Sequence, residues 1–110
     1  MRSLKYGEAI NEGTRQLMEK YNDVIIMGQG LDSPWSVGSS TLGLIKIFGK
    51  SRVIDIPISE NGITGIAIGA AIAGLRPIMV HPRMDFMFYA MDQIANHAAK
   101  WYYIDRKSVV

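Results

Sequence analysis

Cysteine is absent from the 110 residues, which excludes disulfides, thiolate metal ligands and a cysteine nucleophile. Net charge is nearly absent too: the formal value is only +2, and the Lys and Arg residues are scattered, which argues against a nucleic-acid partner. The longest uncharged run, 61–75, is too short and too rich in glycine for a membrane span. Residues 1–11 are polar and show no secretory signal, so we expect a cytoplasmic protein with no membrane partner.

Hydrophobic spacing predicts a single α/β domain, or part of one, in which helices and strands alternate. The run VIIM at 24–27 is apolar throughout, which is typical of a strand covered on both faces. We therefore expect a three-layer parallel sheet with helices on both faces. The expected helices span 6–21, 41–48, 61–74 and 85–103, and the expected strands span 24–27, 52–56 and 78–80.

The turn after the first strand, Gly28-Gln29-Gly30, suggests a phosphate-binding loop at first sight. The third glycine of the G-x-G-x-x-G pattern is missing, because position 33 is serine, and Pro34 opens a loop rather than a helix. We therefore reject a dinucleotide site here. The following polar loop, 31–40, carries Trp35, which we expect to be exposed or to face a partner.

Glu60 is the only charged residue between Asp55 and Arg76. A carboxyl group at the mouth of a segment built for burial is costly to ionise unless it is paired, which makes Glu60 a candidate proton donor or acceptor. The alternative is purely structural: Ser59 caps a helix, and Glu60 sits in its first turn, where the helix dipole favours an acid. The segment alone leaves both readings open.

The helix expected at 61–74 contains four glycines, each of which costs up to about 1 kcal/mol relative to alanine in a helix interior. Gly62, Gly65, Gly69 and Ala73 follow at steps of three, four and four, so they share one stripe. A helix or a cofactor ring could approach this stripe closely. Isoleucines cover the other faces, so we expect a helix buried on all sides at a subunit interface.

His81 and Arg83 follow the third strand, at the edge of the sheet where ligands gather in open α/β folds. Arg83 could bind a substrate carboxylate, with His81 as a second donor. The alternative is a solvated arginine beside a histidine that is bonded to the backbone. No second histidine or acid stands at metal-ligand spacing, so no metal site is expected in this chain.

Two long stretches resemble one family. The residues VIDIPISENGITGIAIGAAIAGLRP at 53–77 match its pattern D-x-P-I-S-E…G-x-A-x-G-A-A-x-x-G-x-R-P, and residues 85–103 match D-[FY]-x-x-x-A-x-D-Q-I-x-N-x-A-A-K-x-x-Y. The chain resembles the pyrimidine-binding, transketolase-like domain of the beta subunit of thiamine-diphosphate-dependent 2-oxoacid dehydrogenases of the pyruvate and branched-chain type. Residues 1–104 resemble its amino-terminal part. Residues 105–110 depart from it and are expected to be a truncated or non-native tail.

This resemblance implies the thiamine-diphosphate-binding fold, here as a truncated pyrimidine domain, and a set of site residues. It makes Glu60 the catalytic acid that hydrogen-bonds the aminopyrimidine ring of the cofactor. Ile58 and Phe86 would pack against that ring. The chain has no G-D-G…N stretch, so Mg²⁺ and the diphosphate would be held by an alpha subunit. Gln29 stands where the family usually has an acid, and glutamine cannot titrate.

The function implied is oxidative decarboxylation of a 2-oxoacid with acyl transfer to lipoamide, by a chain that is inactive alone. The expected partners are the alpha subunit, further copies in a dimer or heterotetramer, and a lipoyl acyltransferase. Two alternatives stay open. One is a ketol-transferring or synthase-type enzyme that uses the same glutamate, and the other is a non-catalytic interaction fragment.

Overall fold

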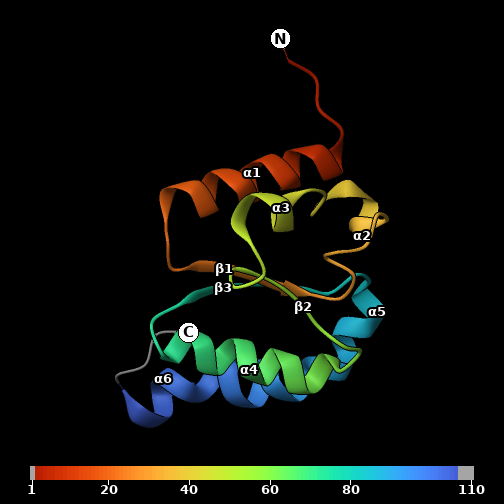
Figure 1. The fold of residues 1–110 in the computed structure, drawn as a ribbon. Coiled ribbons are helices and arrows are strands. Elements are labelled where there is room, and N and C mark those ends of the chain that lie inside the picture. The colour runs from red at the N-terminus through yellow and green to blue at the C-terminus, as the bar shows by residue number, and fades with distance from the viewer. Residues whose placement is uncertain (1, 107–110) are drawn as a thin grey trace.

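The computed structural model describes residues 2–106, apart from the side chain of Ser36, as three layers with a sheet in the middle (Figure 1). The elements are α1 (Tyr6–Lys20), β1 (Val24–Gly28), α2 (Ser36–Ser39), α3 (Leu44–Phe48), β2 (Val53–Asp55), α4 (Glu60–Ile72), β3 (Arg76–Val80), α5 (Met84–Met87), the 3-10 helix η1 (Phe88–Ala90), the π-helix η2 (Gln93–Ala98) and α6 (Ala99–Asp105). The predicted α/β class with a parallel sheet is confirmed.

The three strands are all parallel, in the order β2-β1-β3. The central strand β1 is buried at all five positions, as its uninterrupted apolar sequence predicts. Val24 pairs with Arg76, and Ile26 pairs with both Val53 and Ile78. Within residues 2–106, β3 pairs on one side only, so its other edge forms the rim of the described sheet.

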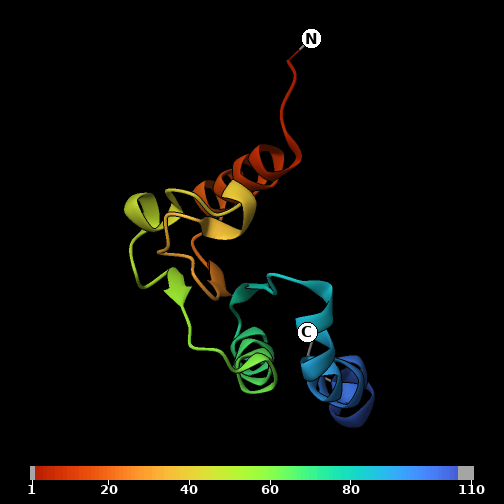
Figure 2. The same cartoon turned by 90° about the vertical axis from the view of Figure 1, so that its right-hand side faces the viewer.

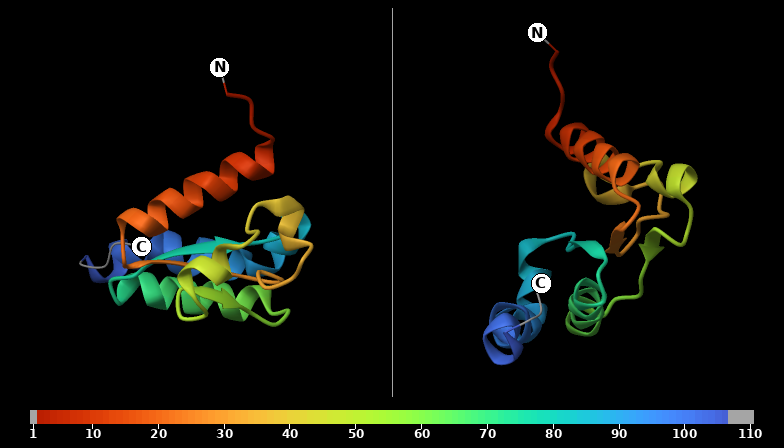
Figure 3. Two further views of the ribbon diagram at one scale, coloured as in Figure 1. Left: turned by 45° about the horizontal axis from the view of Figure 1, so that its top comes forward. Right: turned by 90° about the vertical axis from the view of Figure 1, so that its left-hand side faces the viewer.

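Helices cover the two faces of the sheet unequally. Figure 2 shows α1, α2 and α3 on one face and α4 on the other, with α5 to α6 continuing in the layer of α4. The two views of Figure 3 show the same layers, with the carboxyl-terminal helices running beside α4. Both η1 and η2 contact α4. None of the helices within residues 2–106 is long and apolar enough to span a bilayer.

Each face of the sheet has its own core. The core on the α1 face contains six buried residues. Arg52 donates hydrogen bonds to the carbonyl groups of Met18, Tyr21 and Val24 at 2.7–3.1 Å. The core on the α4 face contains three. The buried residues of the first are Met18, Val24, Ile26, Leu31, Leu44 and Val53, and those of the second are Ile25, Met27 and Ala67.

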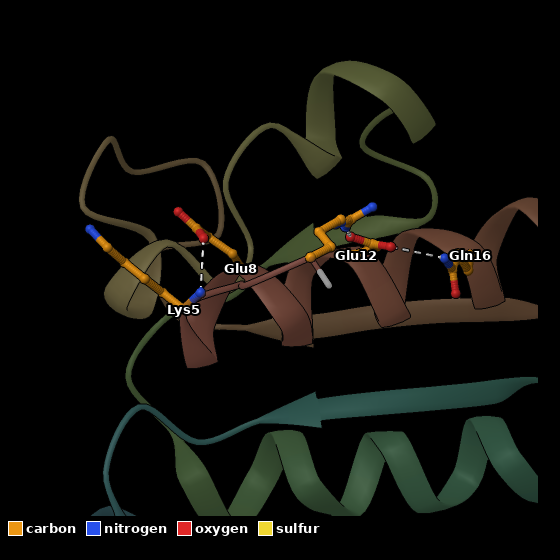
Figure 4. Close-up of polar contacts among 5 residues, drawn as sticks. Lys5, Glu8, Glu12 and Gln16 are labelled. Carbon is orange, nitrogen blue, oxygen red and sulfur yellow. Dashed lines mark hydrogen bonds and ion pairs between the residues drawn. The ribbon is translucent and has the colours of Figure 1, made fainter.

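Helix α1 begins at Tyr6 because an acid in its first turn satisfies a free backbone donor. Figure 4 shows the Glu8 carboxylate accepting the backbone N–H of Lys5 at 3.0 Å, and the Gln16 side chain donating to Glu12 at 3.3 Å. The buried positions of α1 are Thr14 and Met18.

The apolar stripe of α1 lies partly outside the core. Ile10 and Leu17 are exposed, because the sheet beneath them ends at β3. Leu17 and Tyr21 instead line an apolar groove along the rim of β3, with α4 as its other wall. The periodicity identified a real apolar face, but the described sheet covers only one side of it.

Two expectations about helices need comment. The helix at 61–74 leaves Ile66 56% exposed and Ile72 38% exposed in the single chain, so its burial at a subunit interface stays a prediction. The segment expected as one helix at 85–103 is helical from 84 to 105, but its turns change in type through α5, η1, η2 and α6. Helix α6 runs through Asp105, and the tail at 107–110 lies outside the described residues, so the predicted boundary after residue 104 stays a prediction.

Candidate functional site

The carboxyl ends of β1 and β3 and the amino end of α4 bring polar side chains together. Gln29 follows β1, Glu60 is the first residue of α4, and His81 follows β3. Because all three strands run in the same direction, these residues meet at one edge of the sheet. Spacing along the chain does not show that Gln29 and Glu60 touch, and only the strand pairing brings them together.

Glu60 is half-buried and held by Gln29. The Gln29 amide Nε2 donates to Glu60 Oε1 at 3.2 Å, and Oε2 takes no part in this contact. The loop that carries Gln29 is also bonded to the end of β2, since Asp55 Oδ1 accepts the backbone N–H of Leu31 at 3.1 Å. At Gly28 a side chain would lie 2.8 Å from Val80 Cβ, so only glycine allows β1 and β3 to approach this closely.

The purely structural interpretation, in which Ser59 caps the helix and Glu60 lies in its first turn, is supported only in part. Glu60 lies in the first turn of α4, where the helix dipole favours a negative charge. Ser59 occupies the N-cap position, yet its side chain makes no capping hydrogen bond. The carboxylate therefore faces Gln29 as well as the helix end, and the first-turn position does not account for that contact.

Thr64 joins α4 to the end of β3, a contact that the sequence analysis missed. Its hydroxyl donates to the Glu60 carbonyl at 2.7 Å and lies 3.3 Å from His81 Nε2. Burial lowers the pKa of His81 below its ordinary value of 6.5, and the Glu60 carboxylate opposes part of that shift. A threonine four residues after a first-turn acid was the only available signal.

Arg83 is occupied by its neighbours. Its Nε and Nη2 donate to the two carboxylate oxygens of Asp85 at 3.0 and 2.7 Å, and its guanidinium lies 5.0 Å from the centroid of the Phe86 ring. Arg83 would have to exchange Asp85 for a substrate carboxylate. In the present arrangement it restrains the Phe86 ring instead.

The two predicted cofactor-packing residues lie on different segments. Ile58 is 82% exposed in the turn between β2 and α4, and Phe86 is half-buried in α5. The β2–α4 turn and α5 lie at the same end of the molecule (Figure 1). One acid that can hydrogen-bond and two apolar side chains at the same end of a sheet are a combination that suits a flat heteroaromatic ring.

The small-residue stripe of α4 is only partly covered. A side chain at Gly65 would meet the Gln93 amide of η2 at 2.9 Å, so Gly65 makes room for a helix of the same chain. Gly62, Gly69 and Ala73 are exposed, and a side chain at Gly69 would meet nothing within 4 Å. The predicted interface role of these three positions is untested.

An apolar cavity lies along the rim of β3 and reaches Thr64 of the polar edge. It has a volume of about 540 Å³ and follows the rim of β3 between Leu17 of α1 and Ala67 of α4. Its lining is mainly apolar, and it offers no arrangement for catalysis. No group of three or more potential metal ligands occurs within residues 2–106.

The family comparison agrees with this geometry. The family described as "Transketolase, pyrimidine binding domain" matches residues 2–104. The chain therefore belongs to the transketolase pyrimidine-binding domain family, and the resemblance found in its sequence is confirmed.

More specific similarity points to one group of proteins. The chain is 43% identical over 97 residues to the pyruvate dehydrogenase E1 component subunit beta, mitochondrial, of Bos taurus, which covers 88% of this chain and 27% of that protein. It is 41% identical over 97 residues to the E1 subunit beta of Rickettsia bellii, covering 88% and 30%, and 38% identical over 104 residues to that of Rhizobium meliloti, covering 94% and 23%. The chain thus spans less than a third of these relatives.

Proposed function

We propose that this chain is part of the beta subunit of a thiamine-diphosphate-dependent 2-oxoacid dehydrogenase. The observation that carries the proposal is Glu60, held by Gln29 at the carboxyl edge of a parallel sheet. Its support comes from the family match over residues 2–104 and from the pyruvate dehydrogenase E1 subunits beta among the relatives. Because the chain spans less than a third of those relatives, the activity of the whole protein belongs to the proposal.

The residues present fit the aminopyrimidine half of thiamine diphosphate. Glu60 would hydrogen-bond the ring, while Ile58 and Phe86 would pack against its faces. When bound, this cofactor supplies a thiazolium that accepts the electrons released on decarboxylation. The described residues offer no metal-ligand group, so we assign Mg²⁺ and the diphosphate to an alpha subunit.

The role of Glu60 is to hold a proton at a ring nitrogen. Gln29 occupies Oε1, so Oε2 is the oxygen that would face the ring. Glutamine can donate to Oε1 whether or not Glu60 carries a proton on the other oxygen. Gln29 thereby orients the carboxyl group without competing for its proton, which is the support that an acid–base residue needs.

The partners follow from the exposed face of α4. Gly62, Gly69 and Ala73 are open to solvent beside exposed Ile66, and this face would meet the alpha subunit or a second copy. A lipoyl acyltransferase would take the acyl product. A cytoplasmic location stays a prediction, as does a substrate role for His81 and Arg83.

The decisive experiment combines the chain with a candidate alpha subunit and measures thiamine diphosphate and Mg²⁺ binding by calorimetry, together with 2-oxoacid turnover. We expect turnover in the mixture and none from the chain alone. Glu60→Gln should lower turnover by about 10²–10⁴ while the cofactor still binds. Glu19→Gln, a matched change on the exposed face of α1, should leave turnover unchanged.

Three outcomes would redirect the assignment. Turnover by the chain alone would contradict a half-site. Turnover that never transfers an acyl group to lipoamide, but does transfer a ketol group, would favour the transketolase-like alternative. Absence of cofactor binding in every mixture would leave a non-catalytic interaction module.

A further inference from the structure

Thr64 has a single hydroxyl proton and two polar neighbours. Its Oγ1 lies 2.7 Å from the carbonyl oxygen of Glu60 and 3.3 Å from Nε2 of His81. A carbonyl oxygen can only accept, so the threonine proton goes to Glu60. The threonine oxygen must then accept at its other contact, which requires a proton on His81 Nε2.

The other nitrogen of His81 is placed very differently. Nδ1 is buried and has no hydrogen-bond partner among the described residues. A proton there would place an unpaired, charged N–H group away from water, which is costly. With Nε2 protonated by its contact with Thr64, the neutral ring therefore leaves Nδ1 as a bare acceptor.

We propose that Thr64 is a positioning residue that holds His81 as the neutral Nε2–H tautomer beside Glu60. Neither ring nitrogen then offers a free proton to a substrate carboxylate, because Nε2–H is used by Thr64 and Nδ1 carries none. This assigns His81 a role different from the donor role that its position after β3 suggests. His81 ties the end of β3 to the first turn of α4 without adding a positive charge.

Burial, rather than charge, favours a neutral His81 ring. Among the described residues, the Glu60 carboxylate of helix α4 acts in the opposite direction and raises the pKa of His81, but burial is the larger effect. The side facing α1 and the α2 loop contributes Thr14, Ser40 and Thr41, none of which titrates. On its own segment, Arg83 and Asp85 neutralise each other in a two-bond pair.

The consequence for the site rests on the proposed function. An imidazolium beside Glu60 would favour its ionised form, and an ionised Glu60 cannot donate to a cofactor ring nitrogen. Because Nδ1 is buried without a partner among the described residues, the ring stays neutral and His81 adds no positive charge beside the Glu60 carboxyl group. The tautomer itself, however, can be measured without cofactor, partner or turnover.

The test is long-range ¹H–¹⁵N NMR of the uniformly labelled chain at pH 7.5, where imidazole nitrogen shifts distinguish the two tautomers. The chain has two histidines, so His97 serves as an internal control ring. We expect a single Nε2–H form of His81 in the unmodified chain and in Thr64→Ser, which retains a hydroxyl. Thr64→Val, of equal size, should give a mixture of tautomers and leave His97 unchanged.

Two results would overturn the proposal: an Nδ1–H form or a mixture in the unmodified chain, or an unchanged His81 spectrum in Thr64→Val. Glu60→Gln provides a second arm, because removing the carboxylate should lower the titration midpoint of His81 further. A midpoint that stays the same or rises would contradict the neighbouring-charge argument. If the tautomer is as expected but no mixture binds cofactor, the proposed function fails and this inference stands.

Discussion

The two faces of the sheet differ in how completely they are closed. The core on the α1 face has six buried residues, and Arg52 hydrogen-bonds the backbone of one of them, Met18. The core on the α4 face has three buried residues, and Ile66 and Ile72 of α4 are exposed. The α1 face therefore holds the larger of the two cores. The other face carries Glu60 and the open glycine stripe, so the surface available for partners lies where the core is thin.

A large-to-small change at one buried residue on each face should reveal the difference most strongly. Leu44 is fully buried on the α1 face, and Leu44→Ala should lower the free energy of unfolding by about 2–5 kcal/mol. Ile68 is 8% exposed and borders the groove along β3, so Ile68→Ala should cost about 2 kcal/mol, the lower end of that range. Urea denaturation of both variants measures the two losses, and equal losses would remove the distinction between the faces.

Loss of the Arg52 hydrogen bonds should have the next largest effect on the free energy of unfolding. Its guanidinium serves three backbone carbonyl groups and lies 5.2 Å from the centroid of the Phe48 ring. Arg52→Met keeps the apolar stem but removes the guanidinium donors from those carbonyls, which should cost about 1–3 kcal/mol in the same denaturation experiment. Arg15→Met is the control: it removes only an exposed ion pair at 3.5 Å, and its effect should stay within about 1 kcal/mol.

On the α4 face, an exposed helix glycine can be replaced by alanine without a steric clash. A side chain at Gly69 of α4 or at Gly13 of α1 would meet nothing within 4 Å, so alanine at either position should raise stability by about 0.5–1 kcal/mol. If the α4 stripe is an interface, Gly69→Ala should also weaken association with the alpha subunit, and Gly13→Ala should not. Sedimentation of each variant with the alpha subunit measures association separately from stability. Equal association by both variants would contradict an interface role for the α4 stripe.

The smallest expected effect depends on pH. His81 has a lowered pKa in the folded chain, so the unfolded chain binds more protons as pH falls below about 6.5. The stabilisation from a neutral His81 is therefore complete above that pH and is lost as pH falls through the folded-state pKa. His81→Phe should flatten this part of the stability curve, and a slope that is unchanged would assign it to other groups.

The sequence predicted the helices and strands better than it predicted which of their faces are covered by other parts of the chain. The central strand, the parallel class and the position of Glu60 at the start of the helix between β2 and β3 follow from local apolar runs and from turn residues. The exposure of Ile66 did not, because periodicity shows that a face is apolar but not whether the described chain covers it. The π-helix at Gln93–Ala98 was missed for a similar reason: its packing against Gly65 is a tertiary contact.

The same limit applies to the site. A lone acid among apolar residues marked Glu60, and the position after β3 marked His81. The Gln29–Glu60 and Thr64–His81 contacts join residues that lie 31 and 17 positions apart, and no local pattern encodes such pairs. Arg83 was considered either as a ligand for a substrate carboxylate or as a solvated side chain, but its Nε and Nη2 donate to the acid two residues later.

The strand order β2-β1-β3 also sets a schedule for synthesis on the ribosome. β1 is made before either of its neighbours, and its second edge is closed only when Arg76 reaches Val24, about 50 residues later in translation. At roughly 5–20 residues per second, the most apolar strand waits several seconds for its last partner. Its dependence on distant pairing makes β1 the segment that a nascent-chain chaperone would have to shield longest.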